Sequence, residues 1–359
     1  MTTLTVGVVG ATGAAGGEAC RLLLRHPNVG RVVPFARAEG ELSAFHPRLT
    51  EPLPLVPIDT LTERADMDAV LLCTPTGEAM QVSEELVKAG TLVVDLSADH
   101  RFNDPDDLQR WHGVRHPSPQ SLSSACYGLT ELARDEIASA RLIANPGCFA
   151  ITAELALMPL AQAGLLPGRS RATVFAVNGM TGAGSTPRRE TAAAEASATL
   201  LAYGLDGHRH APEIEQALRR WGGSDPVVDL STAHADFRRG IHLTASIEVA
   251  GDALPSREDL LDLFCAAYGE GHDGERFVQV IRRGRQGGLN HKDYSLYPQV
   301  SNVAGTNNCQ IGVDVDLRTR TIKVVAVSDN LGKGAAGGAV QNLNVALGLP
   351  ESAGLEGLE

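Results

Sequence analysis

The stretch LTVGVVGATGAAG, residues 4–16, decides the fold of the N-terminal part of this chain. Leu4–Val9 is a short apolar run that predicts a strand, and the glycine-rich run Gly10–Gly16 follows it without a break. A helical pattern then continues through Leu24. This order of strand, glycine turn and helix is typical of a dinucleotide-binding loop, because glycine lets the backbone approach a pyrophosphate that the helix N-terminus faces.

The glycine spacing is GxxGxxG rather than GxGxxG, and a motif this short is only moderately specific. The alternative is that these glycines merely make a tight turn between a strand and a helix. If the loop is functional, the residues that we expect to contact the dinucleotide are Gly10, Ala11, Thr12, Gly13 and Ala14, together with Thr74 after a later strand.

Further short apolar segments predict the rest of a sheet. They alternate with helical stretches such as Glu78–Ala89, which indicates an α/β domain with a Rossmann-type, doubly wound parallel sheet. The predicted strands are Arg31–Arg37, Ala69–Cys73, Leu92–Leu96 and Arg141–Ala144.

The end of the second predicted strand bears on the choice of cofactor. An NAD-specific site places an acidic side chain there for the ribose 2′-hydroxyl, whereas an arginine accommodates a 2′-phosphate. Arg37 occupies this place, so we expect NADP(H) as the cofactor. The alternative is that Arg37 is a solvated surface residue, which is the usual environment of arginine.

The pattern changes after residue 165. Longer alternating and β-branched segments predict an α+β catalytic domain with a mixed, largely antiparallel sheet that has helices on one face. The predicted strands are Ala172–Asn178, His242–Ala250, Ile311–Asp316 and Ile322–Val327, and the predicted helices are Arg188–Leu201, Pro212–Arg220 and Arg257–Ala267. We expect residues 1–147 to bind the nucleotide, completed by a C-terminal helix within residues 330–350, and residues 148–329 to form the catalytic and dimerisation domain.

Length and composition limit the possible functions. A chain of 359 residues suggests two domains, and 43% hydrophobic with 21% charged residues is typical of a globular protein. The net charge of −12 disfavours nucleic acid and anionic membranes as partners, and no apolar run reaches the ~20 residues that span a bilayer. The N-terminal residues do not resemble a signal peptide, and six scattered cysteines fit reduced thiols without metal spacing, so we expect a cytoplasmic protein with no metal.

The most informative stretch for chemistry is Asn145-Pro146-Gly147-Cys148. It places a cysteine at the start of a helical run, Phe149–Ala163, where unpaired N–H groups and the helix dipole favour the thiolate. Thiolate is the form that attacks a carbonyl, so Cys148 is our candidate nucleophile for acyl transfer. The alternative is a small buried hydrophobic residue, which is a common role of a free cysteine.

Other charged residues suggest how an anionic substrate is handled. The turn Gly207-His208-Arg209-His210 offers imidazoles, which titrate near neutral pH and suit proton transfer, although ordinary surface histidines are the alternative.

Arg101 is expected at the edge of the sheet where α/β domains bind ligands, and a guanidinium suits phosphate or carboxylate. The rival for Arg101 is an ion pair with one of its acidic neighbours, which are Asp99, Asp104, Asp106 and Asp107. Arg209 and Arg239 are further candidates, and Gly182–Ser185 either lines the substrate or only makes a turn.

Taken together, these segments resemble the N-acetyl-γ-glutamyl-phosphate reductase family. No single segment is specific, but their shared order along nearly the whole chain is. They are Gly10–Gly16, His26-Pro27, Val94–Arg101, Tyr127–Glu131, Asn145–Cys148, Gly207–Ile214, Arg239–Ile241, Gly305–Asn307 and Asp329–Ala335.

The resemblance implies a reaction and its residues. N-acetyl-L-glutamyl 5-phosphate, a small-molecule acyl phosphate, would be reduced with NADPH to N-acetyl-L-glutamate 5-semialdehyde through a thioester on Cys148, in arginine biosynthesis. It favours His210 as the catalytic partner and places Asn330 at the nicotinamide end of the cofactor. The substrate-binding residues that we expect are Arg101, Asn145, Arg209 and Arg239. We also expect a homo-oligomer, either a dimer or a tetramer.

Two departures from the family pattern bear on substrate contacts. Ile151 stands where the family usually has threonine, and His234–Arg238 lacks the usual proline. Three other functions remain open. One is a lysine-pathway reductase of carrier-bound aminoadipyl phosphate, although the net charge of −12 offers no obvious basic face for an acidic carrier. The second is aspartate-semialdehyde dehydrogenase, against which Gly207–Ile214 counts. The third is a non-catalytic NADP-binding regulator with an inert thiol.

Overall fold

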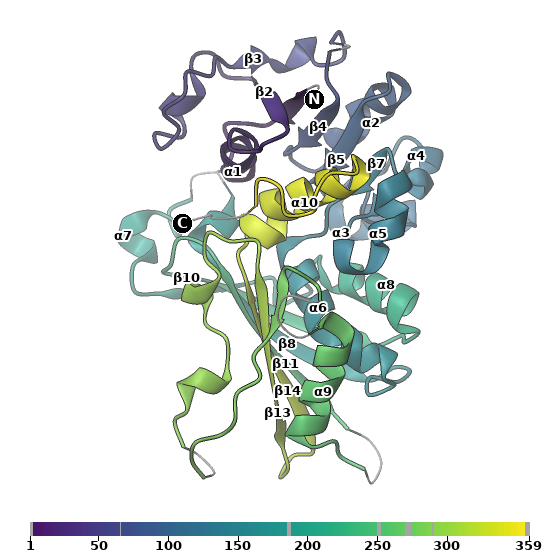
Figure 1. Cartoon of the computed structure of the whole chain (residues 1–359), viewed down its shortest axis with the longest axis vertical. Coiled ribbons are helices and arrows are strands. Elements are labelled where there is room, and N and C mark those ends of the chain that lie inside the picture. Colours follow the sequence, from purple (N-terminus) through teal and green to yellow (C-terminus); the bar gives the residue numbers. More distant parts are fainter. Residues whose placement is uncertain are drawn as a thin grey trace. The chain divides into compact units, whose positions relative to one another are not determined.

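The computed structural model describes residues 3–64, 66–184, 188–249, 253–269, 274–288 and 291–355. The chain divides into two compact units. Unit 1 comprises Met1–Gly147 and Leu331–Glu359, and unit 2 comprises Cys148–Asn330 (Figure 1). In each unit, the described residues form one seven-stranded sheet.

The sheet of unit 1 is parallel, with the strand order β3-β2-β1-β4-β5-β7-β6. Its central strands β1, β4 and β5 are largely apolar, because helices cover both faces of such a sheet. The strands are β1 (Leu4–Val9), β2 (Val29–Ala36), β3 (Val56–Pro57), β4 (Ala69–Leu72), β5 (Leu92–Asp95), β6 (Cys126–Tyr127) and β7 (Leu142–Ala144).

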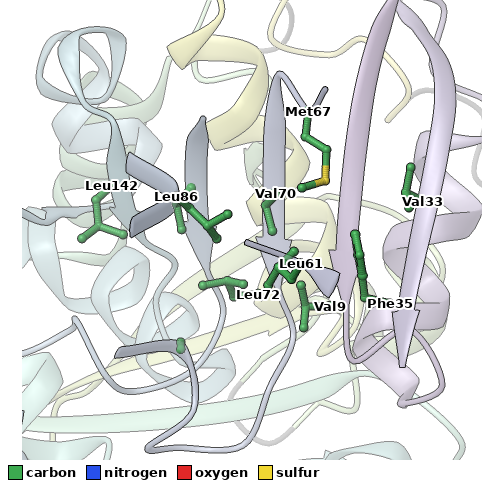
Figure 2. Close-up of a cluster of buried hydrophobic side chains, with 11 residues drawn as sticks. Val9, Val33, Phe35, Leu61, Met67, Val70, Leu72, Leu86 and Leu142 are labelled. Atoms are coloured by element: carbon green, nitrogen blue, oxygen red, sulfur yellow. The ribbon is translucent and has the colours of Figure 1, made fainter. Parts of the chain in front are cut away.

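The core on one face of this sheet lies against helix α2 (Ala79–Lys88). Figure 2 shows Val9, Phe35 and Leu72 on three neighbouring strands, with Leu86 of α2 packed in the same cluster. The other helices of unit 1 are α1 (Ala14–Leu23), α3 (Pro105–His112), α4 (Pro119–Ser124), α5 (Thr130–Ser139) and α10 (Gly337–Ala346).

The C-terminal helix α10 is an integral part of unit 1. The buried amide of Asn342 donates from Nδ2 to the carbonyl of Gly128 at 2.9 Å and to Oδ1 of Asn145 at 3.1 Å. In the π-helical turn before α10, Lys333 is fully buried and pairs with Glu131 of α5 at 2.5 Å. Residues 331–355 therefore belong to the same compact unit as residues up to Gly147.

The sheet of unit 2 is mixed, with the strand order β12-β13-β14-β11-β8-β10-β9. The pairs β8–β10 and β12–β13 are parallel, and the other four neighbouring pairs are antiparallel. The strands are β8 (Arg171–Gly179), β9 (Leu200–Tyr203), β10 (Val227–Ala235), β11 (Ile241–Glu248), β12 (Val278–Val280), β13 (Cys309–Asp316) and β14 (Thr321–Ser328). The predicted fold class, a parallel α/β domain followed by an α+β domain with a mixed sheet, is confirmed.

Three helices cover one face of this second sheet: α6 (Cys148–Gln162), α8 (Ala211–Gly222) and α9 (Arg257–Tyr268) (Figure 1). Along β8, every second residue from Ala172 to Ala176 is buried, whereas Arg171, Thr173 and Phe175 are exposed. This alternation is expected when only one face of a strand is packed. None of the helices within the described ranges is long and apolar enough to cross a membrane.

The predicted helix over residues 188–201 is wrong. Helix α7 spans only Ala193–Ala196, and Leu200–Tyr203 forms strand β9. Alanine favours a helix locally, but β9 pairs antiparallel with Thr232–Ala235 of β10, and Ala198 takes a positive φ of 55° that no helix accepts. Strand pairing with a distant segment therefore overrides the local preference.

The sequence prediction also missed strands β3, β6, β9, β10 and β12 and helices α3, α4 and α5. The other predicted elements are present with boundaries shifted by a few residues. For the strand predicted over His242–Ala250, β11 spans Ile241–Glu248, and Ala250 lies outside the described residues.

Candidate active site

Cys148 is the first residue of helix α6, and its side chain is half-buried. The rest of the helix through Ala161 is buried, so packing fixes its axis. The hydroxyl of Thr152 donates to the Cys148 carbonyl at 2.9 Å and lies 2.7 Å from the Ser328 hydroxyl at the end of β14. The thiol is thus held at a rigid helix N-terminus, where the helix dipole favours a thiolate.

Asn178, near the end of β8, contacts this thiol directly. Its side-chain Nδ2 donates to the Cys148 sulfur at 3.7 Å. The residue is 1% exposed, and its Oδ1 has no hydrogen-bond partner among the described residues. A Cβ on Gly182 would lie 2.1 Å from Nδ2, so glycine at this position leaves room for the amide beside the sulfur. The predicted loop that contains Gly182 is a short 3₁₀ helix, Met180–Ala183, and Ser185 lies outside the described residues.

His208 and His210 lie at the N-terminus of α8, and both side chains are buried. Their rings are 4.8 Å apart, and the ring of Phe149, the residue after Cys148, lies 5.5 Å from His208 and 6.0 Å from His210. Burial, with the nearby charges of Arg209 and His234, lowers the pKa of His208 to about 4. His208 is therefore neutral at pH 7, and its Nδ1 accepts the backbone N–H of His210 at 3.2 Å.

Two further aromatic residues extend this cluster, and the sequence reasoning did not select either of them. Tyr203 of β9 stacks on His234 of β10 with ring centroids 4.4 Å apart, and it lies 5.7 Å from His208. Burial lowers the pKa of His234, and burial together with the Cys148 charge raises the pKa of Tyr203. His234 pairs in register with Asn178, so both belong to the surroundings of the thiol. Pairing of β8 with β10 brings them together, and no local motif signals it.

Arg239 and Asn330, predicted to contact substrate and cofactor, belong to one polar network in unit 2. Arg239 forms a two-pronged ion pair with Asp329, with contacts of 2.6 and 2.9 Å, and Asp329 also accepts the N–H of Gly305 at 2.6 Å. Asn330 accepts the N–H of Gly240 at 2.7 Å and donates to the hydroxyl of Thr181 at 3.0 Å. Both side chains therefore hold the loops around the ends of β8 and β14. Arg209, by contrast, is exposed.

In unit 1, the glycine loop has the geometry that a dinucleotide needs. Gly10 has φ +78°, and a Cβ there would lie 2.4 Å from the Cys73 carbonyl. A Cβ on Gly16 would lie 2.3 Å from the Gly10 carbonyl, so this glycine allows α1 to pack closely on β1. A Cβ on Gly13, the N-cap of α1, would meet only the Gly10 carbonyl, at 3.4 Å, which leaves the helix N-terminus open to an anion.

The other predicted loop residues surround this N-terminus. Ala11 is buried, Thr12 is half-buried and Ala14, the first residue of α1, is exposed. His46, which the sequence reasoning missed, contacts the Ala11 carbonyl through Nε2 at 3.0 Å. The buried hydroxyl of Thr74, just past β4, has no hydrogen-bond partner among the described residues. The glycine geometry and this unsatisfied hydroxyl fit a bound dinucleotide.

Arg37 lies one residue past β2, and its side chain is 71% exposed. It forms an ion pair with Glu78 at 2.9 Å. An exposed guanidinium at this edge of the sheet fits the position of a 2′-phosphate ligand.

Arg101 and Asn145 support the turn that precedes Cys148 in the chain. Arg101 is buried, and it donates to the carbonyls of Asn145 at 2.9 Å and Leu96 at 2.7 Å. The Asn145 amide accepts from Asn342 and donates to the carbonyls of Pro146 and Ala335. Of the acidic neighbours of Arg101, Asp99 accepts two backbone N–H groups, from Gly77 and Met80, and Asp104 caps helix α3.

Comparisons with known proteins agree with this arrangement. Residues 5–140 match the family described as semialdehyde dehydrogenase, NAD binding domain, and residues 148–330 match semialdehyde dehydrogenase, dimerisation domain. The chain is 17% identical to the solved aspartate semialdehyde dehydrogenase II of Vibrio cholerae, with a TM-score of 0.69 over 97% of this chain and 99% of that one. At this identity the likeness shows a shared fold.

Curated relatives are much closer in sequence. N-acetyl-gamma-glutamyl-phosphate reductase of Halalkalibacterium halodurans is 40% identical over 99% of both chains. The proteins of the same name from Laribacter hongkongensis and Methanopyrus kandleri are each 39% identical over 98% of both chains. The chain therefore belongs to the N-acetyl-γ-glutamyl-phosphate reductase family of semialdehyde dehydrogenases.

Proposed function

We propose that this protein reduces N-acetyl-L-glutamyl 5-phosphate to N-acetyl-L-glutamate 5-semialdehyde and phosphate with NADPH, as a step of arginine biosynthesis. Full-length relatives of that name support the substrate. The observation that carries the chemistry is the Cys148 thiol, which lies at the N-terminus of α6 and accepts a hydrogen bond from Asn178. Both features favour a thiolate, which is the nucleophile that acyl transfer needs.

The first step is attack of the Cys148 thiolate on the acyl carbon of the substrate. A carbon–sulfur bond forms, the bond from carbon to the phosphate oxygen breaks, and inorganic phosphate leaves with the bonding electron pair. The buried amide of Asn178 donates from Nδ2 to the sulfur, so it is a positioned donor for the negative charge that develops on the carbonyl oxygen. The product of this step is a thioester on Cys148.

When bound, NADPH supplies the hydride that reduces this thioester. The residues that would hold it are the glycine loop, with Gly10 and Gly13, the hydroxyl of Thr74 and the guanidinium of Arg37. The preference for NADP over NAD is part of the proposal and rests on Arg37.

His210 is the proton donor and acceptor in this proposal. After reduction, the former carbonyl oxygen takes up a proton, and collapse to the aldehyde returns the electron pair of the carbon–sulfur bond to the Cys148 sulfur. His208 is unsuited to this exchange because its pKa of about 4 keeps it neutral at pH 7. Since the backbone N–H of His210 donates to the Nδ1 of His208, the neutral ring orients the start of α8.

Arg209 and Arg239 are proposed to recognise the substrate carboxylate. Arg209 is exposed next to His210, and Arg239 is oriented by its ion pair with Asp329. A guanidinium binds a carboxylate through two parallel hydrogen bonds, which gives both affinity and orientation. Arg101 and Asn145 contribute as supports of the turn before Cys148.

We further propose that the protein is a cytoplasmic homo-oligomer that assembles through unit 2. The matched description of residues 148–330 as a dimerisation domain supports this. On the face of the sheet opposite the helices, Phe175 is 43% and Val227 36% exposed, and adjacent strands carry them. The six free cysteines fit a reducing compartment. Light scattering of the wild type and of Phe175→Asp tests the assembly, since a monomeric wild type contradicts it.

The reaction is tested in its reverse direction, as phosphate-dependent reduction of NADP⁺. N-acetylglutamate semialdehyde, aspartate semialdehyde and aminoadipate semialdehyde are compared at equal concentration, with Cys148→Ser as the inactive control. We expect kcat/KM to be highest for N-acetylglutamate semialdehyde by at least about 10²-fold, because buried or paired groups that recognise a substrate reject analogues that lack their partner. A higher value for either of the other aldehydes contradicts the proposed substrate, and no phosphate dependence contradicts the thioester route.

A further inference from the structure

The ion pair between Arg37 and Glu78 joins two segments that flank the glycine loop of unit 1. Strand β1 lies between β2 and β4 in the sheet, as the neighbouring positions of Val9, Phe35 and Leu72 in Figure 2 show. Arg37 follows β2, and Glu78 lies in the segment that leads from β4 to α2. Their side chains meet at 2.9 Å, with 71% and 31% of the respective side chains exposed.

The glycine loop is fixed to both of these segments. The N–H groups of Gly10 and Ala11 donate to the Phe35 carbonyl at 3.0 and 3.2 Å, and Gly10 lies against the Cys73 carbonyl. The segment that carries Glu78 is also fixed, because the buried carboxylate of Asp99 accepts the N–H groups of the residues on either side of Glu78–Ala79, at 2.7 and 3.0 Å. The backbone of Glu78 is therefore held in place, and its carboxylate stays close to Arg37.

From this geometry we infer that Glu78 sets the balance between NADPH and NADH, an inference that rests on the proposed function. A 2′-phosphate carries about two negative charges near pH 7, so it must compete with Glu78 for the guanidinium of Arg37. It is also repelled by the nearby carboxylate. The 2′-hydroxyl of NADH is a neutral donor, for which a carboxylate is the usual partner. Arg37 favours NADPH, and Glu78 reduces that preference. The pair therefore offers a cation to the 2′-phosphate of NADPH and a carboxylate to the 2′-hydroxyl of NADH.

The test is binding of NADPH and NADH to the whole protein without substrate, measured by cofactor fluorescence and calorimetry. Glu78→Gln keeps the size of the side chain and removes its charge. We expect Kd for NADPH to fall about three- to tenfold, because the variant frees Arg37 from its ion pair and removes the repulsion between Glu78 and the 2′-phosphate. The effect is modest because an exposed ion pair is weak. Kd for NADH is expected to stay the same or to rise by up to about threefold, since glutamine is a weaker acceptor than a carboxylate.

Two matched measurements isolate the effect. Glu84→Gln removes an acid from helix α2, which Glu78 precedes; the Glu84 side chain is 47% exposed against 31% for Glu78 and pairs with Lys88, and we expect no change in either Kd. Adenosine 2′,5′-bisphosphate and 5′-AMP carry only the adenosine end of the cofactors. Glu78→Gln is expected to strengthen binding of the bisphosphate and to leave binding of 5′-AMP unchanged or weaker.

The outcomes separate this inference from the proposed function. If NADPH binds and Arg37→Gln weakens it selectively, but Glu78→Gln leaves the ratio of the two Kd values unchanged, Glu78 has no role in cofactor choice and the proposed function stands. If Glu84→Gln has the same effect as Glu78→Gln, the effect is general surface charge and the inference is wrong. If the wild-type protein binds neither cofactor, the proposed function and the inference are both wrong.

Discussion

The side-chain Nδ2 of Asn178 donates a hydrogen bond to the sulfur of Cys148 across 3.7 Å. The two residues lie on different elements, the end of β8 and the first turn of α6. Asn178 is 1% exposed, and a Cβ on Gly182 would lie only 2.1 Å from Nδ2, so the amide is closely packed beside the sulfur. Asn178 is therefore placed to act on the thiol and on any acyl group bound to it.

Replacing Asn178 by alanine is expected to lower kcat about 10- to 10³-fold, because a fixed donor to a developing negative charge contributes up to that range. The alkylation rate of Cys148 by iodoacetamide should fall at pH 7 and recover at higher pH, since the thiolate loses a donor. Asn302→Ala removes an exposed amide in the same unit and serves as the control. An alkylation profile that matches the wild type would limit Asn178 to a structural role.

Cys148→Ser is expected to abolish turnover while NADPH still binds. Serine lacks both the acidity and the leaving-group ability of the thiol, and the residues proposed to hold the nucleotide belong to unit 1. Steady-state rates and fluorescence titration with NADPH measure the two properties. Mass spectrometry of the wild type with acyl phosphate and no cofactor should show acylated Cys148. More than about a tenth of the wild-type rate in the serine variant rules out the covalent route.

His210→Asn is expected to lower kcat about 10²- to 10⁴-fold with little change in cofactor affinity, because proton transfer contributes in that range. His208→Asn should have a smaller effect, since His208 is neutral at pH 7 and acts through the backbone of His210. Single-turnover hydride transfer compares the two variants directly. If hydride transfer is slower in the His208 variant, His208 and not His210 transfers the proton.

Protein stability is expected to fall as the pH falls from about 6.5 to about 4, in part through His208. Its folded pKa of about 4 lies below the ordinary value of 6.5, so the unfolded chain binds more protons in this window and acid favours unfolding. The lost stability from this residue is at most about 3 kcal/mol. Burial also lowers the pKa of four other histidines, so their titration likewise reduces stability as the pH falls. They are His26, His116, His234 and His242.

Urea unfolding of the wild type and His208→Asn at pH 7 and pH 4.5 measures this contribution. Asparagine cannot take up a proton in this range, so the free energy of unfolding should fall less with acid in the variant. Equal losses in the two proteins would mean that His208 titrates alike in the folded and unfolded states.

Lys333→Met is expected to destabilise the protein by about 3–5 kcal/mol, because it leaves the Glu131 carboxylate buried without its cation. Both side chains are 1% exposed. Lys88→Met breaks an exposed pair with Glu84 and should cost less than about 1 kcal/mol. Denaturant unfolding compares the two, and Glu131→Gln combined with Lys333→Met should recover part of the loss. A cost for Lys333→Met no larger than that for Lys88→Met would show that the buried pair does not stabilise unit 1.

Much of the fold was predictable from local patterns. The strand, glycine turn and helix of residues 4–16 form β1, the loop and the start of α1, because a buried parallel strand must be apolar and a tight turn at φ +78° requires glycine. The family resemblance is confirmed by relatives that match over nearly the full length. The helix over residues 188–201 was wrong because β9 gains its stability from pairing with β10, which local composition does not report.

The sequence was sufficient to select the candidate reactive residues, but not the residues that surround them. Cys148 is recognisable because its position after a Pro-Gly turn marks a helix N-terminus, and the two histidines share one short turn. Asn178, Tyr203 and His234 carry no motif, since each is an ordinary strand residue until β8, β9 and β10 pair.

The sequence by itself therefore determined the fold class and the family, and it selected Cys148 as the candidate nucleophile, because local propensity, turn chemistry and shared motifs are readable along the chain. Only the tertiary structure decided which polar groups face one another. It directs the Asn178 amide to the Cys148 sulfur, uses Arg101 to hold backbone carbonyls and sets Glu78 beside Arg37. These contacts join segments that are distant along the chain, and they form only when burial and strand pairing bring the segments together.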